Sequence, residues 1–136
     1  MTRFSAETPR ERVRLIVDAI TAHRERASPY LTIEIDETSL EDGAGPDPDL
    51  GVPWIQFADG TISLDCTDDE LERLKGLLAE FPAFKIEELI RPEEAEGTNA
   101  RVSAKADPNR IAQFCDGVIQ EVFDCPEDTI IWIAAV

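Results

Sequence analysis

The chain has 136 residues, a formal net charge of −16 and 43% hydrophobic residues, which fits a single domain that buries roughly two-thirds of its unfolded surface. No apolar run approaches the roughly 18 residues of a membrane span, and this hydrophobic content argues against a disordered chain. The amino terminus lacks the apolar stretch of a signal peptide and the three cysteines follow no disulfide pattern, so we expect a cytoplasmic protein.

The first predicted element is a helix over residues 9–26. Thr8 has the position of a helix cap, Pro9 stands at the first helical position and Glu11 completes a capping box. Apolar residues then recur at helical spacing: Val13, Ile16, Val17 and Ile20. This pattern predicts an amphipathic helix that packs one face on the core.

This first helix is the basic part of an acidic chain. Residues 1–27 carry six arginines against four acids, whereas the other 109 residues carry seven bases against 25 acids. One interpretation is that the arginines complement the helix dipole and pair with the acidic body. The other is a basic face that contacts an acidic partner or phosphates, although no aromatic residues are interleaved for base stacking. The candidate contact residues are Arg10, Arg14, Arg24 and Arg26.

Strand patterns follow the helix. Residues 30–36 alternate apolar and polar side chains, as in a half-solvated strand. Residues 53–65 form two runs joined at Asp59-Gly60, a favoured hairpin turn. Between them, residues 37–52 are rich in Gly, Pro and Asp. We interpret them as a surface loop and not a calcium site, because the ligand spacing of an EF-hand is missing.

Residues 65–70 place a cysteine among acids. Thr67 and Glu70 have the spacing of a capping box, and Cys66 and Leu71 occupy the positions of a hydrophobic staple. The alternatives are a reactive thiol and an adventitious cation site. The neighbouring carboxylates disfavour a thiolate, since no basic residue adjoins the cysteine to offset them. We therefore expect a structural junction between a strand and a helix, with no resident metal.

The remaining elements alternate between strands and helices. The second helix, which starts after Thr67, has a buried stripe: Leu71, Leu74, Leu78 and Phe81. A third helix begins at Pro108, directly after the cap residue Asp107. Its buried stripe consists of Ile111, Phe114, Cys115, Val118 and Val122. Strands are predicted over residues 83–90, 100–106 and 129–136.

The order of these elements predicts an α+β fold with a mixed, mostly antiparallel sheet. Residues 61–136 read as a ferredoxin-like βαββαβ unit, preceded by the basic helix (1–27) and by extra strands with an acidic loop (28–60) in the same single domain. The Asp59-Gly60 hairpin conflicts with the standard strand order, because it gives the first strand of the unit an additional neighbour. Either the hairpin strand replaces a standard neighbour or the sheet has a related topology.

Two tryptophans complete the candidate contact residues. Trp54 begins the hairpin, and Trp132 lies on the last strand between two isoleucines. At a sheet edge such a strand would favour association with a partner or with a second copy of the chain. An interior position in the sheet would explain the same residues.

Three stretches of the chain carry a family resemblance: "TPRERVRLIVDAITAHR", "VPWIQFADGTISLDCTDDELERLKGLL" and "RIAQFCDGVIQEVFDCPEDTIIWIA". They resemble an uncharacterised family of small acidic haloarchaeal proteins. The resemblance implies no known activity, ligand or catalytic residue. It implies that the charge is an adaptation to salt, which agrees with a count of ten arginines and three lysines.

Signals of catalysis are weak. His23, the one histidine, continues the apolar stripe of the first helix, and Cys115 and Cys125 are too far apart for a CxxC pair. No glycine-rich phosphate-binding motif is present. We therefore expect no cofactor and no metal.

These observations favour a non-enzymatic binding or regulatory module that acts through protein contacts, as a monomer or a homodimer. Two alternatives remain: an enzyme with a hidden carboxylate or metal-assisted site, and a protein that associates with nucleic acid through the basic helix.

Overall fold

A computed structural model gives the fold of the chain. It describes residues 4–6, 8–26, 31–35, 54–58, 60–91, 97–125, 127 and 129–135. The strands are β1 (Phe4–Ala6), β2 (Leu31–Ile35), β3 (Trp54–Ala58), β4 (Thr61–Cys66), β5 (Lys85–Ile90), β6 (Thr98–Ser103) and β7 (Ile131–Ala135). The helices are α1 (Pro9–Arg26), α2 (Asp68–Leu78) and α3 (Pro108–Gly117), which continues into the π-helical turn η3 (Val118–Val122).

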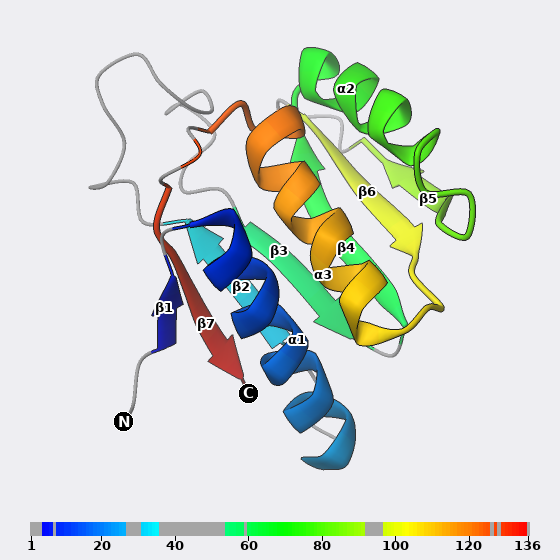
Figure 1. Cartoon of the computed structure of the whole chain (residues 1–136). Helices are drawn as coiled ribbons and strands as arrows, with labels where there is room; N and C mark the ends of the chain where they lie inside the picture. Colours follow the sequence, from blue (N-terminus) through cyan, green and yellow to red (C-terminus); the bar gives the residue numbers. More distant parts are fainter. Residues whose placement is uncertain are drawn as a thin grey trace.

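The strands form one seven-stranded sheet in the order β1-β7-β2-β3-β4-β6-β5, and each adjacent pair is antiparallel. All three helices lie on the same face of this sheet (Figure 1). Helix α3 is central, with α1 along one side and α2 along the other, so the described helices cover only one face.

The hydrophobic core lies between the sheet and the helices. Alternate residues of the central strands are buried on this face, among them Ile33, Ile55, Ile62 and Val102. Their neighbours along each strand therefore point away from the helices, because successive side chains of a strand alternate between faces. This alternation defines a second, more polar face, which none of the described helices covers.

The expected α+β class, with its N-terminal helix and antiparallel sheet, is confirmed. The order β4-β6-β5 and the strand directions follow the ferredoxin-like pattern. In that pattern β7 would lie beside β4, but here β2 and β3 lie between them. The hairpin strand β3 thus replaces a standard neighbour of β4, and the expectation that the sheet would also contain parallel pairs is wrong for the described strands.

The helix boundaries were predicted well, and the strands less well. Helix α1 has the expected bounds, whereas β6 begins at Thr98, two residues earlier than predicted. Strand β1, which pairs with β7, was not predicted from the sequence. The predicted loop 37–52 lies outside the described residues. Within the described residues no helix combines the length and the apolar character that crossing a membrane requires.

Candidate functional site

The acidic stretch around Cys66 is a structural junction, as predicted. The Thr67 hydroxyl accepts a hydrogen bond from the Glu70 amide at 3.1 Å, and the Glu70 carboxylate accepts one from the Thr67 amide at 2.8 Å. Cys66 is fully buried, and burial raises the pKa of its thiol to about 12, with Glu70 and Asp65 adding to the effect. A thiolate nucleophile is therefore disfavoured here.

The other two cysteines are also poor nucleophiles. Burial raises the pKa of Cys115 to about 12 and that of Cys125 to about 11. Among the described residues, no group of three or more His, Cys, Asp or Glu side chains is arranged to hold a metal ion.

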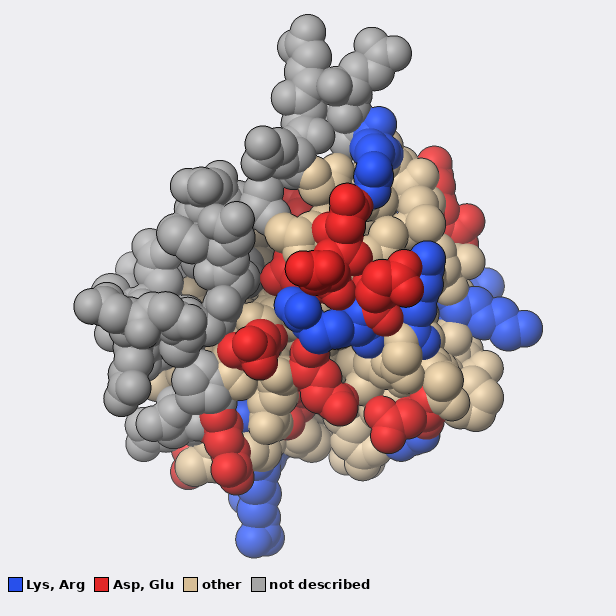
Figure 2. All heavy atoms as spheres, turned by 90° about the horizontal axis from the view of Figure 1, so that it is seen from above, with Lys and Arg blue, Asp and Glu red and all other residues tan. Residues whose placement is uncertain are grey.

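The structure describes the side chains of only two of the four predicted arginine contacts. Arg10 and Arg14 are exposed on α1, while Arg24 and Arg26 belong to its last turn, where the side chains lie outside the described residues. Arg12, between the first two, is fully buried. In the view of Figure 2, the basic and acidic side chains of the described residues are interleaved.

Arg12 joins α1, α3 and the segment before β7. Its Nε donates to Asp116 Oδ1 at 2.6 Å, and its Nη1 donates to the carbonyls of Glu127 and Thr129 at 2.7 and 2.8 Å. Gln120 Nε2 donates to the second oxygen of Asp116 at 2.6 Å. This role of Arg12 was not predicted from the sequence, although Arg12 is four positions before Ile16 and therefore lies on the apolar stripe.

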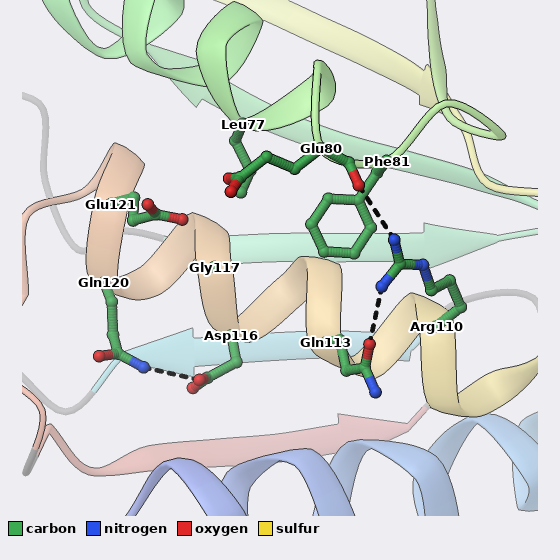
Figure 3. Close-up of a pocket in the computed structure, with 9 residues that line it drawn as sticks. All are labelled: Leu77, Glu80, Phe81, Arg110, Gln113, Asp116, Gly117, Gln120 and Glu121. Carbon is green, nitrogen blue, oxygen red and sulfur yellow. Dashed lines mark hydrogen bonds between the residues drawn. The ribbon is translucent and has the colours of Figure 1, made fainter.

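A polar groove of about 600 Å³ lies between the C-terminal end of α2 and the α3–η3 helix (Figure 3). Leu77, Phe81 and Gly117 form its apolar part. A Cβ at Gly117 would lie 3.0 Å from Leu77 Cδ1, so a glycine at this position allows the two helices to approach closely. The π-helical turn begins directly after it, and such turns are frequent at functional sites.

Arg110 closes one end of this groove. Its guanidinium carbon lies 4.1 Å from the centre of the Phe81 ring. Its Nη1 donates to Gln113 Oε1 at 2.9 Å and its Nη2 to the Glu80 carbonyl at 3.0 Å (Figure 3). These bonds hold the guanidinium against the ring and stabilise the contact between α2 and α3.

The carboxylates of the groove suit acid–base chemistry poorly. Both oxygens of Asp116 accept hydrogen bonds, from Arg12 and Gln120. Glu80 and Glu121 are exposed to solvent, whereas catalytic sites usually exclude water from the reacting groups. The groove therefore gives little support to the hidden carboxylate enzyme.

The strand register brings the two predicted tryptophans together on the uncovered face. Glu34 on β2 pairs directly with Trp54 on β3 and with Trp132 on β7. Trp132 also pairs with Ser5 on β1. Glu34 is exposed and both tryptophans are half-buried. The three side chains thus form a row across neighbouring strands, which we call the tryptophan–glutamate row.

Most of the other described residues on β4 and β6 of this face are polar, and some of them are hydrogen-bonded to one another. Asn99 Nδ2 donates to Asp65 Oδ1 at 3.0 Å and to Ser63 Oγ at 3.2 Å. Arg101 and Glu88 form an ion pair at 3.7 Å. Large aromatic surface on this face is therefore concentrated at the tryptophan–glutamate row.

The match to a family model covers the entire sequence: the family DUF7975, described as a family of unknown function, matches residues 1–136. No curated protein and no solved structure matches the chain. Function has to be inferred from the geometry of the chain itself.

Proposed function

Because the chain belongs to the family of unknown function DUF7975, we propose a function from its geometry: a non-enzymatic cytoplasmic module that binds a partner protein on the uncovered face of its sheet. The observation that carries the proposal is the tryptophan–glutamate row. Trp132, Glu34 and Trp54 are direct neighbours on a face that none of the described helices covers.

Tryptophan is among the residues that dominate binding energy at protein interfaces, because it buries a large area with few rotatable bonds. An ordinary half-solvated sheet places small or polar residues on its open face. This face follows that pattern on β4 and β6, with Ser63, Asn99 and Arg101, and departs from it at Trp54 and Trp132. The departure supports a contact surface at the β7–β2–β3 end of the sheet.

The charge of the chain supports a salt-adapted, haloarchaeal setting as part of the same proposal. At a net charge of −16, self-repulsion destabilises the folded state until salt screens it, and the Debye length falls from about 10 Å at 0.1 M to about 3 Å at 1 M. We expect the free energy of unfolding to rise between 0.1 and 2 M KCl. A free energy that is constant or falls over this range would contradict salt adaptation.

Photo-crosslinking at matched positions tests the binding surface. A photoreactive phenylalanine analogue replaces Gln56, which neighbours the row on β3, or Gln113, which lies in the groove on the helix side. Both proteins are expressed in the source organism and irradiated at native salt. We expect one defined partner to crosslink at position 56 and not at position 113. Crosslinking of that partner only at position 113, or no crosslink at position 56, contradicts the proposal.

A further inference from the structure

We propose that the tryptophan–glutamate row binds an arginine side chain of the partner, with the guanidinium between the two indoles and its N–H groups directed at the Glu34 carboxylate. This inference rests on the proposed function, since it names the chemistry by which the partner is recognised.

The register gives the row a suitable spacing. Directly opposed residues of antiparallel strands have Cβ atoms about 5 Å apart, so the Cβ atoms of Trp132 and Trp54 lie about 10 Å apart on either side of Glu34. A planar group stacked on both sides needs about 7 Å, which is twice the separation of roughly 3.5 Å between carbon atoms in contact. The separation of the two Cβ atoms exceeds that width.

The chemistry of the row favours a cation, and arginine in particular. The face of an indole is electron-rich and attracts cations, and a carboxylate accepts two parallel hydrogen bonds from a guanidinium. The guanidinium is planar and more weakly hydrated than the lysine ammonium, so it stacks on aromatic rings at lower desolvation cost. None of the ion pairs formed among the described residues includes Glu34.

A second carboxylate strengthens the negative field of this face. Ile55 pairs with Leu64 between β3 and β4, and continuing that register by one residue places the exposed Asp65 beside Trp54. Aromatic residues on an open sheet can also stack the bases of a single-stranded nucleic acid. Two carboxylates beside the indoles would repel its phosphates, so the observations favour a basic protein segment.

A second copy of the chain is a poor donor of this arginine. Among the exposed arginines whose side chains are described, Arg10 and Arg14 are on α1 and Arg73 is on α2, and both helices pack on the opposite face of the sheet. The other two, Arg91 and Arg101, form ion pairs with Asp68 and Glu88 of their own chain. Docking α1 of one copy on the row of another would join unlike surfaces. Such contacts tend to generate open chains of subunits instead of closed dimers. The inferred occupant is therefore a different protein that presents an arginine.

Peptide binding tests the inference. Blocked Gly-Arg-Gly, and matched peptides with citrulline or lysine in place of arginine, are titrated against the full chain while tryptophan emission is recorded. Citrulline has the shape of arginine without its charge. We expect the arginine peptide to bind at least tenfold more tightly than the citrulline peptide and severalfold more tightly than the lysine peptide. The Glu34→Gln variant should bind the arginine peptide about tenfold more weakly, and the helix-side control Glu80→Gln should bind it as the wild type does.

The outcomes separate this inference from the proposed function. Equal binding of the arginine and citrulline peptides, or no effect of Glu34→Gln, overturns the arginine inference. The proposed function still stands in that case if the partner crosslinks at position 56. Tighter binding of a (dT)20 oligonucleotide than of the arginine peptide, lost in Trp54→Phe, also overturns the inference because it assigns the row to nucleic acid. A protein that elutes as a dimer whose tryptophan emission changes on dilution overturns it in favour of self-association.

Discussion

Arg12 and Asp116, 104 residues apart in the sequence, meet inside the protein with 2.6 Å between Arg12 Nε and Asp116 Oδ1. The arginine is fully buried, and its Nη1 donates to two backbone carbonyls of the segment that leads into β7. A single side chain thus connects α1, α3 and the entry to the strand that carries Trp132.

The Arg12→Met substitution tests this connection. Methionine keeps most of the length of the side chain but leaves the Asp116 carboxylate without its charged partner, and breaking a buried ion pair in this way costs roughly 3–5 kcal/mol. We expect a loss of about 3 kcal/mol, at the lower end of that range, because the Asp116 side chain is 11% exposed. The matched control Arg14→Met on the exposed side of α1 should change the free energy of unfolding by less than about 0.5 kcal/mol. Urea denaturation measures both, and similar losses in the two variants would contradict the account.

The cap of α2 gives a second prediction. Thr67→Ala removes the hydroxyl that accepts the Glu70 amide, so the free energy of unfolding should fall by about 1 kcal/mol. Thr21→Ala is the matched control, because Thr21 is exposed in the interior of α1 and bonds only to the carbonyl one turn earlier. Alanine is the better helix former at this position, so we expect no loss of unfolding free energy in Thr21→Ala. A loss at Thr21 as large as that at Thr67 would argue against the cap.

We expect alanine substitutions at two helical glycines to change stability differently, because helix propensity favours alanine at both positions and packing opposes it at only one. In an exposed helix, alanine is better than glycine by about 1 kcal/mol. A Cβ at Gly76 of α2 would meet nothing within 4 Å, whereas one at Gly117 would meet Leu77 at 3.0 Å. Gly76→Ala should therefore raise the midpoint of thermal unfolding, and Gly117→Ala should raise it less or lower it. The close approach of the helices is contradicted if Gly117→Ala stabilises the protein as much as Gly76→Ala does.

Because the thiols are buried, we expect the free energy of unfolding to fall at alkaline pH. The folded pKa of Cys115 is raised from 9.0 to about 12 by burial, so the unfolded chain ionises first as the pH rises. The stabilising contribution is fully present below pH 9 and is lost between about pH 9 and 12. Cys115→Ala should therefore show a shallower fall of unfolding free energy with pH, by up to about 1.4 kcal/mol per unit above pH 9. Denaturation curves at pH 8, 9, 10 and 11 give the two slopes, and equal slopes would contradict the raised pKa.

Local signals were the part of the fold that could be predicted. The Thr67 and Asp107 caps involve residues three positions apart, and both are present in the structure. The position of β7 beside β2 could not be predicted, because it depends on pairing between segments about 100 residues apart. Arg12 was overlooked because a search for apolar periodicity passes over a charged residue, even one that lies on the stripe.

The candidate site could be predicted only in part, because its arrangement also depends on pairing between strands that are distant in the sequence. Trp54 and Trp132 stood out as large aromatic residues at strand positions, but Glu34 looked like any solvent-facing strand residue. Its place between the tryptophans follows from the register of β2 with two different strands. That register also separates Trp54 and Trp132 from Arg10 and Arg14, which lie on the helix side of the sheet.

The central claim is that both indoles contact one occupant on the uncovered face. The chain has two tryptophans and both belong to the row, so the variants Trp54→Phe and Trp132→Phe each report on one indole. Titration of both with the blocked Gly-Arg-Gly peptide is the most direct measurement. The account predicts that emission changes in both variants, each with binding a few-fold weaker than in the wild type. A response from one indole alone, or from neither, would contradict it.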